Sequence, residues 1–492
     1  MPMTNENLNR DLEYLNGNIT ELNNIAEIKE ADVSPSSVLK RLFRKMTYWL
    51  YKPMFDQQTA VNKHIQASLA DIYRIQCGLN RNIEKLSAEI ETLRGRDGAF
   101  DSLSINVQNN NRDIDALRGA VAALSAPKCW LGKNGRPRVI QLVSSLNYGD
   151  AVGNEVIAFK KALVCAGYVT EIFTEAISPK LPADTAKHYR LMPTLDEDDI
   201  VIYHFASQCA LFDVVKNLKC RVILRYHNIT PPEFFEGYDE NAVRACSVGL
   251  EQAAELKDIV DYCLPVSEFN KTDLENMGYT CPMKVMPILI RFSDYELTPG
   301  QGVIDRYSDG ITNILFVGRV APNKKFQDVI SAFAEYKKTY DRTARLFLVG
   351  SFGEGDRYYS ELLQHIRSIG VEDVIFPGHI PFADILAYYS IADVFLCMSE
   401  HEGFCVPLVE AMYFHVPVVA YASSAIPSTL GGSGILLESK DFSAAAAEVN
   451  RLVTDEALRS ETVEKQDRRL RDFDADVIKN SLIEYLEEII NG

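Results

Sequence analysis

One short segment of the chain places a glycine and two cations directly after an apolar run. Gly318 and Arg319 follow 313–317, and Lys324 lies five residues beyond Arg319. The glycine allows a sharp turn, after which an arginine and a lysine at this spacing could converge on one multiply charged anion. Arginine offers a two-pronged hydrogen-bond fork and lysine a point charge, which together suit a diphosphate. Taken alone, the same pattern also fits an ordinary surface loop.

A second segment carries two carboxylates around a turn that leads into a predicted helix. It runs from Ser399 to Glu410 with the sequence SEHEGFCVPLVE. Pro407 falls in the first turn of that helix, where proline is favoured and where free backbone N–H groups can bind phosphate or sugar oxygens. Glu402 in the loop and Glu410 in the helix could face different parts of one polar ligand, such as sugar and ribose hydroxyls. The alternative for Glu410 is an acid that interacts favourably with the start of the helix dipole.

Alternating strands and helices must position these residues. We predict strands at 138–143, 200–205, 221–226, 313–317, 345–349, 374–376, 394–397 and 418–421, with helices between them such as 153–166, 326–336 and 358–369. This alternation predicts parallel strands in doubly wound sheets. Because the pattern restarts near residue 313, we expect two Rossmann-like halves, at 137–295 and 305–475. Ligands bind beyond the carboxyl ends of such strands, so the halves are expected to face a cleft.

The second half resembles the family 4 glycosyltransferases of GT-B fold. The resemblance is carried by motifs in a familiar order: Phe316-Val-Gly-Arg319, Val349-Gly350, Pro377-Gly-His379, Ala392-Asp-Val-Phe-Leu396, Glu402-Gly-Phe404, Leu408-Val-Glu-Ala-Met412 and Pro417-Val-Val-Ala420. A weaker resemblance extends over 137–295. The resemblance to this family implies transfer of a sugar from a nucleotide diphosphate donor, UDP- or GDP-linked, with retention of anomeric configuration and with no metal or other cofactor required. It also implies an N-terminal, acceptor-side domain at 131–300 and a nucleotide-sugar-binding domain at 301–492.

The resemblance also assigns roles in the second half. Arg319 and Lys324 match the pair that binds the donor diphosphate, and Glu402 and Glu410 match the two ends of a Glu-x7-Glu motif that contacts donor sugar and ribose. The intervening turn matches the loop whose backbone amides meet the donor; it consists of Gly403, Phe404, Cys405 and Val406. The expected catalytic set is therefore Arg319, Lys324 and Glu402, joined by a histidine from the first half.

That histidine is His227, which follows a predicted strand and resembles the one that reaches the transferred sugar in this family. His204, at the end of the strand 200–205, is a less secure neighbour. The alternative for both is an ordinary partly buried histidine. Gly149 and Gly153 open the first helix where the family places a glycine loop near the donor phosphates, although the usual adjacent glycine pair is absent.

The chain departs from the family at four other positions. The family commonly has glycine where this chain has Lys325, Cys405 and His415, and often glutamate where it has Ser428. Lys325 adds a cation and Cys405 a side chain to the donor loops. The identity of the donor therefore does not transfer from the family.

The first 130 residues form a separate region, predicted to be helical. Heptad spacing of apolar residues between 61 and 93 predicts a coiled coil, which serves either as an oligomerisation element or as a hairpin that folds back on itself. Residues 37–55 carry five cations and no acid, in a helical pattern that includes Trp49. Such a basic amphipathic helix suits an anionic membrane surface, or else packs on the arm's own core.

Charge and composition limit the partners and the compartment. The chain has 492 residues and a net charge of −17, and residues 1–130 are neutral, with 16 Lys and Arg against 16 Asp and Glu. The acidic remainder argues against a nucleic-acid binder. The ten cysteines include no C-x-x-C pair, so we expect mostly small buried thiols in a reducing compartment rather than zinc or disulfides. Asp196–Asp199 precedes a strand and is interpreted as a solvated turn rather than a metal site.

Together these patterns predict a hexosyltransferase of bacterial-type cell-surface polysaccharide assembly, such as O-antigen or capsule. Its acceptor is expected to be a glycan, and the basic helix favours a lipid-linked one. The polar N-terminus has no signal-peptide core, so a cytoplasmic protein, peripheral on the cytoplasmic face of the membrane, is expected. The alternative from another class is a non-catalytic GT-B scaffold assembled through the coiled coil. A glycan phosphorylase or a sugar-nucleotide epimerase of related fold is a further alternative.

Overall fold

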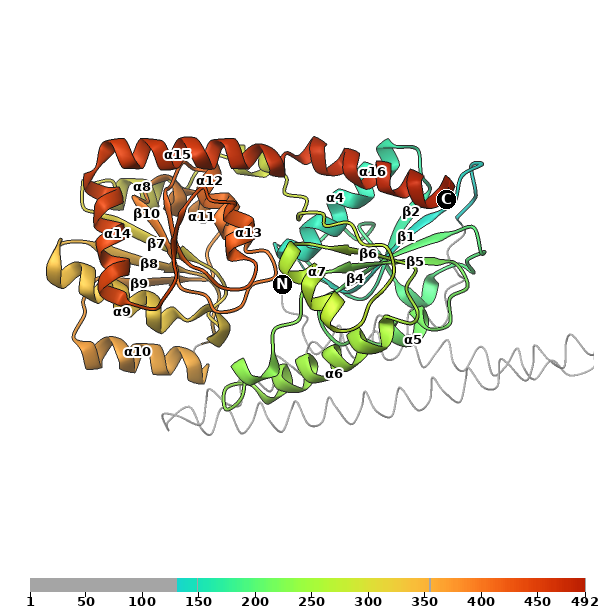
Figure 1. The fold of residues 1–492 in the computed structure, drawn as a ribbon, viewed down its shortest axis with the longest axis horizontal. Coiled ribbons are helices and arrows are strands. Elements are labelled where there is room, and N and C mark those ends of the chain that lie inside the picture. Colours follow the sequence, from blue (N-terminus) through green and yellow to red (C-terminus); the bar gives the residue numbers. More distant parts are fainter. Residues whose placement is uncertain (1–130, 148, 354, 492) are drawn as a thin grey trace, which may run out of the picture. The chain divides into compact units, whose positions relative to one another are not determined.

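The computed structural model describes residues 131–147, 149–353 and 355–491. The predicted arm (1–130), with its coiled coil at 61–93 and its basic helix at 37–55, lies outside these residues. Within them the chain forms two α/β halves, each built on a six-stranded parallel sheet with helices packed around it (Figure 1).

The first half contains six strands and four helices of its own. The strands are β1 (Val139–Leu146), β2 (Thr170–Ile177), β3 (Lys187–His188), β4 (Ile200–Phe205), β5 (Arg221–Tyr226) and β6 (Tyr262–Pro265). The helices are α4 (Ala151–Cys165), α5 (Leu211–Val215), α6 (Glu240–Leu256) and α7 (Glu268–Asn276). Asp150, Asp239 and Ser267 begin α4, α6 and α7 by accepting hydrogen bonds from free backbone N–H groups of the first turn.

The second half repeats the alternation of strands and helices. Its strands are β7 (Asn313–Val317), β8 (Arg345–Val349), β9 (Val374–Gly378), β10 (Val394–Cys397), β11 (Val418–Tyr421) and β12 (Ile435–Leu437). Its helices are α8 (Gln301–Tyr307), α9 (Phe326–Thr339), α10 (Arg357–Ile369), α11 (Phe382–Ser390), α12 (Val406–Tyr413), α13 (Ile426–Leu430), α14 (Phe442–Thr454) and α15 (Glu456–Leu470), followed by the last helix of the chain, α16 (Ala475–Asn491).

Both sheets have the same strand order. The first runs β3-β2-β1-β4-β5-β6 and the second β12-β11-β10-β7-β8-β9, which is the doubly wound order 3-2-1-4-5-6 in each case. The order reverses between β1 and β4 in the first half and between β7 and β10 in the second. The loops at these two switch points are where a ligand is expected to bind. The predicted fold class, two Rossmann-like doubly wound halves, is confirmed.

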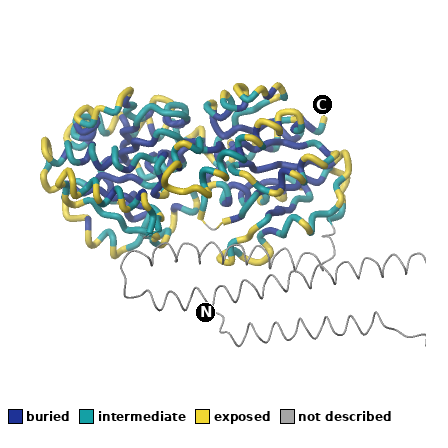
Figure 2. The backbone as a smooth tube through the Cα atoms, turned by 90° about the horizontal axis from the view of Figure 1, so that it is seen from below, coloured by how far each residue is buried: buried dark blue, intermediate teal, exposed yellow. Residues whose placement is uncertain are grey.

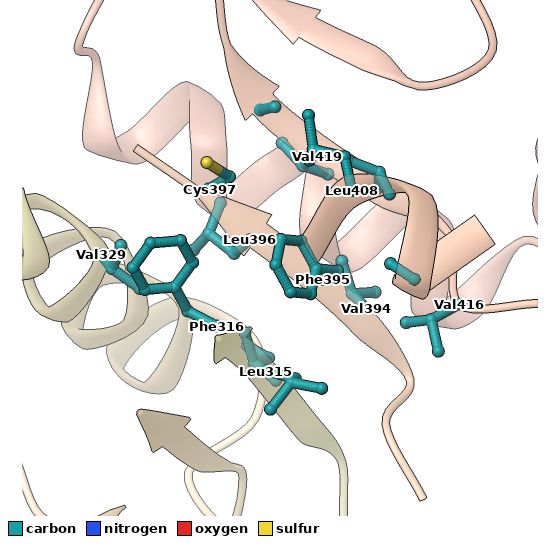
Figure 3. Close-up of a cluster of buried hydrophobic side chains, with 14 of the residues drawn as sticks. Leu315, Phe316, Val329, Val394, Phe395, Leu396, Cys397, Leu408, Val416 and Val419 are labelled. Carbon is teal, nitrogen blue, oxygen red and sulfur yellow. The ribbon is translucent and has the colours of Figure 1, made fainter. Parts of the chain in front are cut away.

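Strands β4, β8 and β10 are buried along their whole length, as parallel strands covered by helices on both faces must be. In β4, Val201 and Tyr203 pack into one apolar cluster while Ile200 and Ile202 pack into another. In the second half, residues of β7, β10 and β11 meet side chains of α9 and α12 in a single core (Figure 3). Buried segments lie through the middle of each half and exposed ones around its edge (Figure 2).

Helix α16 modifies the predicted domain boundary. It follows α15 in the chain but lies beside α4 of the first half (Figure 1). Its buried residues Ile478, Leu482 and Leu486 belong to the same apolar cluster as Val139 and Phe159. The range 301–492, predicted as one domain, therefore ends with a helix that completes the core of the first half.

Candidate functional site

The switch point of the second half brings together the loops that follow β7 and β10. Arg319 lies just beyond β7 with an exposed side chain, and within the described part of the chain it forms no ion pair or side-chain hydrogen bond. The neighbouring β8 loop approaches closely, since a Cβ on Gly350 would lie 1.9 Å from the Gly318 carbonyl oxygen. The sequence motif at Gly350 thus marks a position that admits no side chain, because the backbone of Gly318 lies against it.

Lys324 and Glu402 form an ion pair across this switch point. The Lys324 ammonium lies 2.6 and 2.5 Å from the two carboxylate oxygens of Glu402. Both side chains are largely buried, with 21% of Lys324 and 6% of Glu402 exposed. Burial alone would lower the pKa of Lys324, but the Glu402 carboxylate more than offsets it and the pKa is raised. The lysine predicted to bind diphosphate therefore already has an anionic partner.

A second, more exposed set of charges surrounds this pair. The Lys325 ammonium lies 3.0 Å from Glu400, whose other oxygen lies 2.8 Å from Lys440. Lys440 also pairs with Asp328. These cations hold the pKa of Glu400 below its ordinary value, although its partial burial acts in the opposite direction. The extra cation at Lys325 is thus engaged by an acid of the neighbouring loop.

Asn323 joins the two loops and is a residue that the sequence analysis missed. Its side-chain amide donates to the backbone carbonyl of His401, 3.0 Å away, and its backbone carbonyl accepts from the backbone N–H of Glu400. Asn323 is only 5% exposed. These two bonds fix the position of Glu402 relative to Lys324.

Glu410 occupies a different environment from Glu402. It lies in α12, where the Tyr389 hydroxyl donates to one of its oxygens at 2.7 Å and the Tyr295 hydroxyl to the other at 3.0 Å. Burial raises the pKa of Glu410, and these two hydroxyl donors offset part of that rise. Neither Arg319 nor Lys324 is among its described partners. The structure therefore brings Lys324 and Glu402 together but holds Glu410 with tyrosines.

The turn predicted to meet the donor has a strained backbone. Cys405 adopts a left-handed φ of 70° immediately before α12, which Val406 begins. Phe404 is buried against Phe473, and its carbonyl accepts from the Thr429 hydroxyl. The hydrogen bond with Cys397, together with burial, holds the pKa of Cys405 well above its ordinary value, so the thiol stays protonated.

The glycine loop of the first half is also formed, despite its unusual spacing. Gly149 has a left-handed φ of 82°. A Cβ on Gly153 would lie 2.7 Å from the Asn147 carbonyl oxygen. The Asp150 side chain accepts from the N–H of Gly153 and begins α4. Each of the two predicted glycines therefore meets a geometric requirement at the switch point of the first sheet.

A buried polar cluster lies behind this loop, at the ends of β4 and β5. Nδ1 of His204 lies 3.1 Å from Nε2 of His227, and Nε2 of His204 lies 3.0 Å from the Gln141 side-chain oxygen. Arg225 donates to both oxygens of Glu155, at 2.6 and 3.0 Å. Burial lowers the pKa of both histidines well below the ordinary value, and the nearby Arg225 guanidinium acts in the same direction on each. Both imidazoles are therefore neutral.

This cluster is the one described group that could offer three donor atoms to a metal ion. One carboxylate oxygen of Glu155 and one nitrogen each of His204 and His227 lie within 4.8 Å of one another. Both Glu155 oxygens, however, already accept from the Arg225 guanidinium, and one also accepts from the backbone N–H of Leu289. A hydrogen-bonded network thus accounts for the cluster, with a fixed cation where a metal would need an electron-rich site.

The two switch points meet through His401 and Asn228. Nε2 of His401 lies 2.5 Å from the side-chain oxygen of Asn228, and the His401 ring packs against Phe234 and Phe269. A Cβ on Gly403 would lie 2.6 Å from the carbonyl oxygen of His227. The predicted donor loop therefore lies directly against the turn that carries the predicted sugar-binding histidine.

Several members of these clusters were given no role from the sequence: Gln141, Glu155, Arg225, Asn228, Asn323 and His401. Gln141 and Arg225 had a usable signal, because each is a polar residue between two large hydrophobic or aromatic residues of a predicted strand. Such a residue needs a specific partner. The pairing of His401 with Asn228 had no comparable signal, since it joins loops of different halves.

Two other predictions have outcomes in the described residues. Asp196 is exposed, but Asp199 is fully buried and lies 2.5 Å from Arg138, so the predicted solvated turn is wrong for its last residue. The eight described cysteines are all free, and four are buried. No helix in the described ranges is long and apolar enough to cross a membrane.

The second half matches the family model described as glycosyl transferases group 1, over residues 309–469. O-antigen chain mannosyltransferase B of Escherichia coli is 24% identical over 247 residues, which cover 49% of this chain and 63% of that protein. The putative colanic acid biosynthesis glycosyltransferase WcaL of Salmonella typhimurium is 26% identical over 273 residues, or 52% and 63%. The chain thus spans less than two thirds of the length of these curated relatives.

Both halves match solved structures of the same architecture. Sucrose-phosphate synthase from Thermosynechococcus elongatus superposes with a TM-score of 0.59 at 16% identity, covering 72% of this chain and 100% of that chain. At this identity the likeness shows the fold alone. Residues 309–469, which include Arg319, Lys324, Glu402 and Glu410, therefore match the glycosyl transferases group 1 model within a chain of GT-B fold.

Proposed function

We propose that the chain is a retaining glycosyltransferase that moves a hexose from a nucleotide diphosphate sugar to a glycan acceptor. The observation that carries the proposal is the ion pair of Lys324 and Glu402 beside the exposed Arg319, at the switch point of a glycosyl transferases group 1 domain. A switch point presents strand-end loops to a ligand, and here those loops carry two cations suited to a diphosphate.

The geometry supports a division of work between the two cations. Arg319 has no anionic partner in the described chain, so it offers a full charge to an incoming diphosphate. Lys324 is held by Glu402 and would share its protons between that carboxylate and the donor. Fixed charge at the leaving group would supply most of the rate acceleration, because it stabilises the negative charge that grows there in the transition state.

Glu402 would orient the donor sugar rather than attack it. Both of its oxygens face the Lys324 ammonium, which makes the carboxylate a poor nucleophile but a rigid hydrogen-bond acceptor. The acceptor hydroxyl would attack the anomeric carbon from the side of the leaving group, and its proton would pass to a phosphate oxygen of the departing nucleotide. This step needs no metal, and attack from the side of the leaving group retains the anomeric configuration.

The relatives support a place in surface polysaccharide assembly. The two compared above are named for O-antigen and colanic acid biosynthesis, and a third, from Staphylococcus aureus, for capsular polysaccharide biosynthesis. We propose a lipid-linked glycan as acceptor, with the basic segment 37–55 at the cytoplasmic face of the membrane and the heptads at 61–93 as an oligomerisation element. Flotation with anionic liposomes tests the segment; equal flotation after its deletion would remove it from the proposal.

The activity is tested by nucleoside diphosphate release with UDP-, GDP- and ADP-sugars, with and without added glycan acceptor. Release that depends on acceptor supports a transferase, whereas a scaffold would release none. We expect Arg319→Ala to lower kcat/KM by about 100-fold or more, since it removes the cation that would stabilise the negative charge on the leaving group. Lys338→Ala is the matched control, because that lysine is exposed and pairs only with Glu335 of its own helix. Equal activity of Arg319→Ala and the control would contradict the assignment.

A further inference from the structure

The polar cluster of the first half forms a chain of hydrogen bonds that is open at both ends. It runs from the Gln141 amide through His204 to His227, and all three side chains are almost fully buried. At one end the Gln141 side-chain nitrogen has no partner, and at the other end Nδ1 of His227 has none. A buried polar atom without a partner is costly, so each open end requires an explanation.

The donors and acceptors of this hydrogen-bond chain can be arranged in only one of two directions at a time. If Gln141 accepts from His204, then Nδ1 of His204 is bare and accepts from Nε2–H of His227, which leaves Nδ1 of His227 bare as well. If the amide is reversed, every bond reverses with it and Nδ1 of His227 carries a proton. A neutral imidazole has one donor and one acceptor nitrogen, which is why the three groups must switch together.

Glu155 favours the first direction. Its carboxylate oxygen lies 3.6 Å from Nε2 of His227 and 4.0 Å from Nδ1 of His204. A proton on the nearer nitrogen is attracted to the carboxylate, whereas a lone pair there would be repelled by it. Arg225 and the N–H of Leu289 hold the carboxylate in place. The bond to the Gln141 oxygen has the same direction.

We propose that Gln141 and His204 are positioning residues that fix His227 with a bare Nδ1, so that His227 can accept but not donate a hydrogen bond. This proposal rests on the proposed function, in which His227 meets the donor sugar. A bare imidazole nitrogen accepts from a sugar hydroxyl and repels a carboxylate. The site would therefore select a neutral hexose over the corresponding uronic acid.

The position of His227 connects the hydrogen-bond chain to the predicted donor loops. The carbonyl of His227 lies against Gly403, one residue from Glu402, and Asn228 contacts His401. Water does not reach Nδ1 of His227 in this structure, so a hydroxyl meets it only after a neighbouring segment moves. The hydroxyl would then complete the one open end of the chain that lies at the contact between the halves.

Nitrogen-15 NMR of the full chain labelled at histidine tests the direction without any ligand. The chain has 8 histidines, which His→Gln variants assign. In the wild type we expect a protonated Nε2 and a bare Nδ1 in both His204 and His227. Gln141→Leu removes the acceptor at the end of the chain and is expected to shift His227 toward the reversed tautomer. Gln141→Glu keeps an acceptor and should retain the wild-type pattern.

Gln252→Leu is the matched control, because Gln252 is a partly buried glutamine of the first half that hydrogen-bonds the backbone of Cys209 instead. A protonated Nδ1 of His227 in the wild type would overturn the proposal, as would an unchanged tautomer in Gln141→Leu. Stoichiometric bound metal, with both imidazoles shifted by it, would overturn it as well. The wild-type spectrum decides even if Gln141→Leu does not fold.

A binding panel of UDP-glucose, GDP-mannose and their uronic acids tests the consequence. We expect the uronic acid to bind more weakly than the parent sugar by about tenfold, and this ratio to shrink in Gln141→Leu but not in Gln252→Leu. Equal binding of sugar and uronic acid would overturn the selectivity. Failure of every nucleotide sugar to bind would instead contradict the proposed function, while the tautomer measured by NMR would stand.

Discussion

The two halves of the molecule share one strand order but treat the polar groups at their switch points in opposite ways. In the first half, Arg225 and Glu155 neutralise each other completely out of contact with water, and the two histidines beside them are uncharged. In the second half, Lys324 and Glu402 remain in partial contact with solvent, and Arg319 is exposed. The polar cluster of the first half is therefore buried and has no net charge, whereas the second half carries partly exposed charges that can exchange partners.

The backbone differs between the halves in a parallel way. Residues other than glycine with a left-handed φ number five in the described second half, and the first half has one, Asn228. Three of the five, Lys325, Cys405 and His415, border α9 or α12, the helices next to the donor loops. The unfavourable backbone conformations of the described residues thus lie mostly in the second half.

The largest expected effect comes from breaking the buried pair of the first half. Arg225→Met leaves the Glu155 carboxylate buried without a cation, and we expect the free energy of unfolding to fall by about 3–5 kcal/mol. Lys271→Met is the control, since its pair with Glu275 is exposed and is expected to contribute about 0–1 kcal/mol. Urea unfolding measures both. Lys324→Met, in the second half, should cost less than Arg225→Met because water reaches that pair.

A double variant sharpens the same comparison. Glu155→Leu combined with Arg225→Met leaves no buried charge, so part of the stability lost in the single variant should return. If Arg225→Met lowered the free energy of unfolding no more than Lys271→Met, the description of the first half as a neutral cluster held by a buried ion pair would fail.

The next effect is a loss of stability in acid that originates in the first half. Burial holds the pKa of His204 and His227 well below the value of about 6.5 expected in the unfolded chain. Above that value both states are neutral and the stability is fully present. As the pH falls below it, only the unfolded state takes up protons, so the free energy of unfolding drops by about 1.4 kcal/mol per pH unit for each histidine.

Urea unfolding between pH 7.5 and 5 measures this slope. His204→Gln removes one of the two groups and should make the decline shallower, whereas His379→Gln, at an exposed position of the second half, should leave it unchanged. An equal slope in the wild type and in His204→Gln would mean that the histidines of the first half carry protons in the folded state.

Much of the fold could be predicted because apolar runs specify buried parallel strands. The bounds of β4, β5, β7, β8, β10 and β11 are those predicted. The strands that were missed, β2, β3, β6 and β12, are edge strands, short, or interrupted by acids, as in β2 with Glu171 and Glu175. For these, tertiary pairing rather than local pattern decides the conformation.

The site was predictable in its parts but not in its pairings. Arg319, Lys324 and Glu402 lie at the switch point because each follows a strand whose end the sequence marks. That Lys324 and Glu402 bind each other, 78 residues apart, depends on the order of β7 and β10 in the sheet. Likewise Gln141 and His204 are 63 residues apart. The departures from family glycines at Lys325, Cys405 and His415 did locate three left-handed residues.

The smallest expected effect concerns one of those left-handed residues in the second half. His415 follows α12 with a φ of 56°, and the helix end has the Schellman arrangement: the N–H of Val416 bonds the Ala411 carbonyl and the N–H of His415 bonds that of Met412. A residue with a Cβ is strained there by about 1–2 kcal/mol, while glycine loses about 0.4–1 kcal/mol through its freer unfolded state. The exposed His415–Asp467 pair contributes little.

We therefore expect His415→Gly to stabilise the protein by about 0.5–1 kcal/mol in urea unfolding, with unchanged donor binding. Gln364→Gly, at an exposed position in the interior of α10, should instead destabilise it by about 1 kcal/mol, because glycine is unfavourable inside a helix. Stabilisation without loss of binding would show that the left-handed backbone at His415 serves only to end α12. A loss of donor binding would place His415 with Lys325 and Cys405, whose strained conformations shape the loops of the site itself.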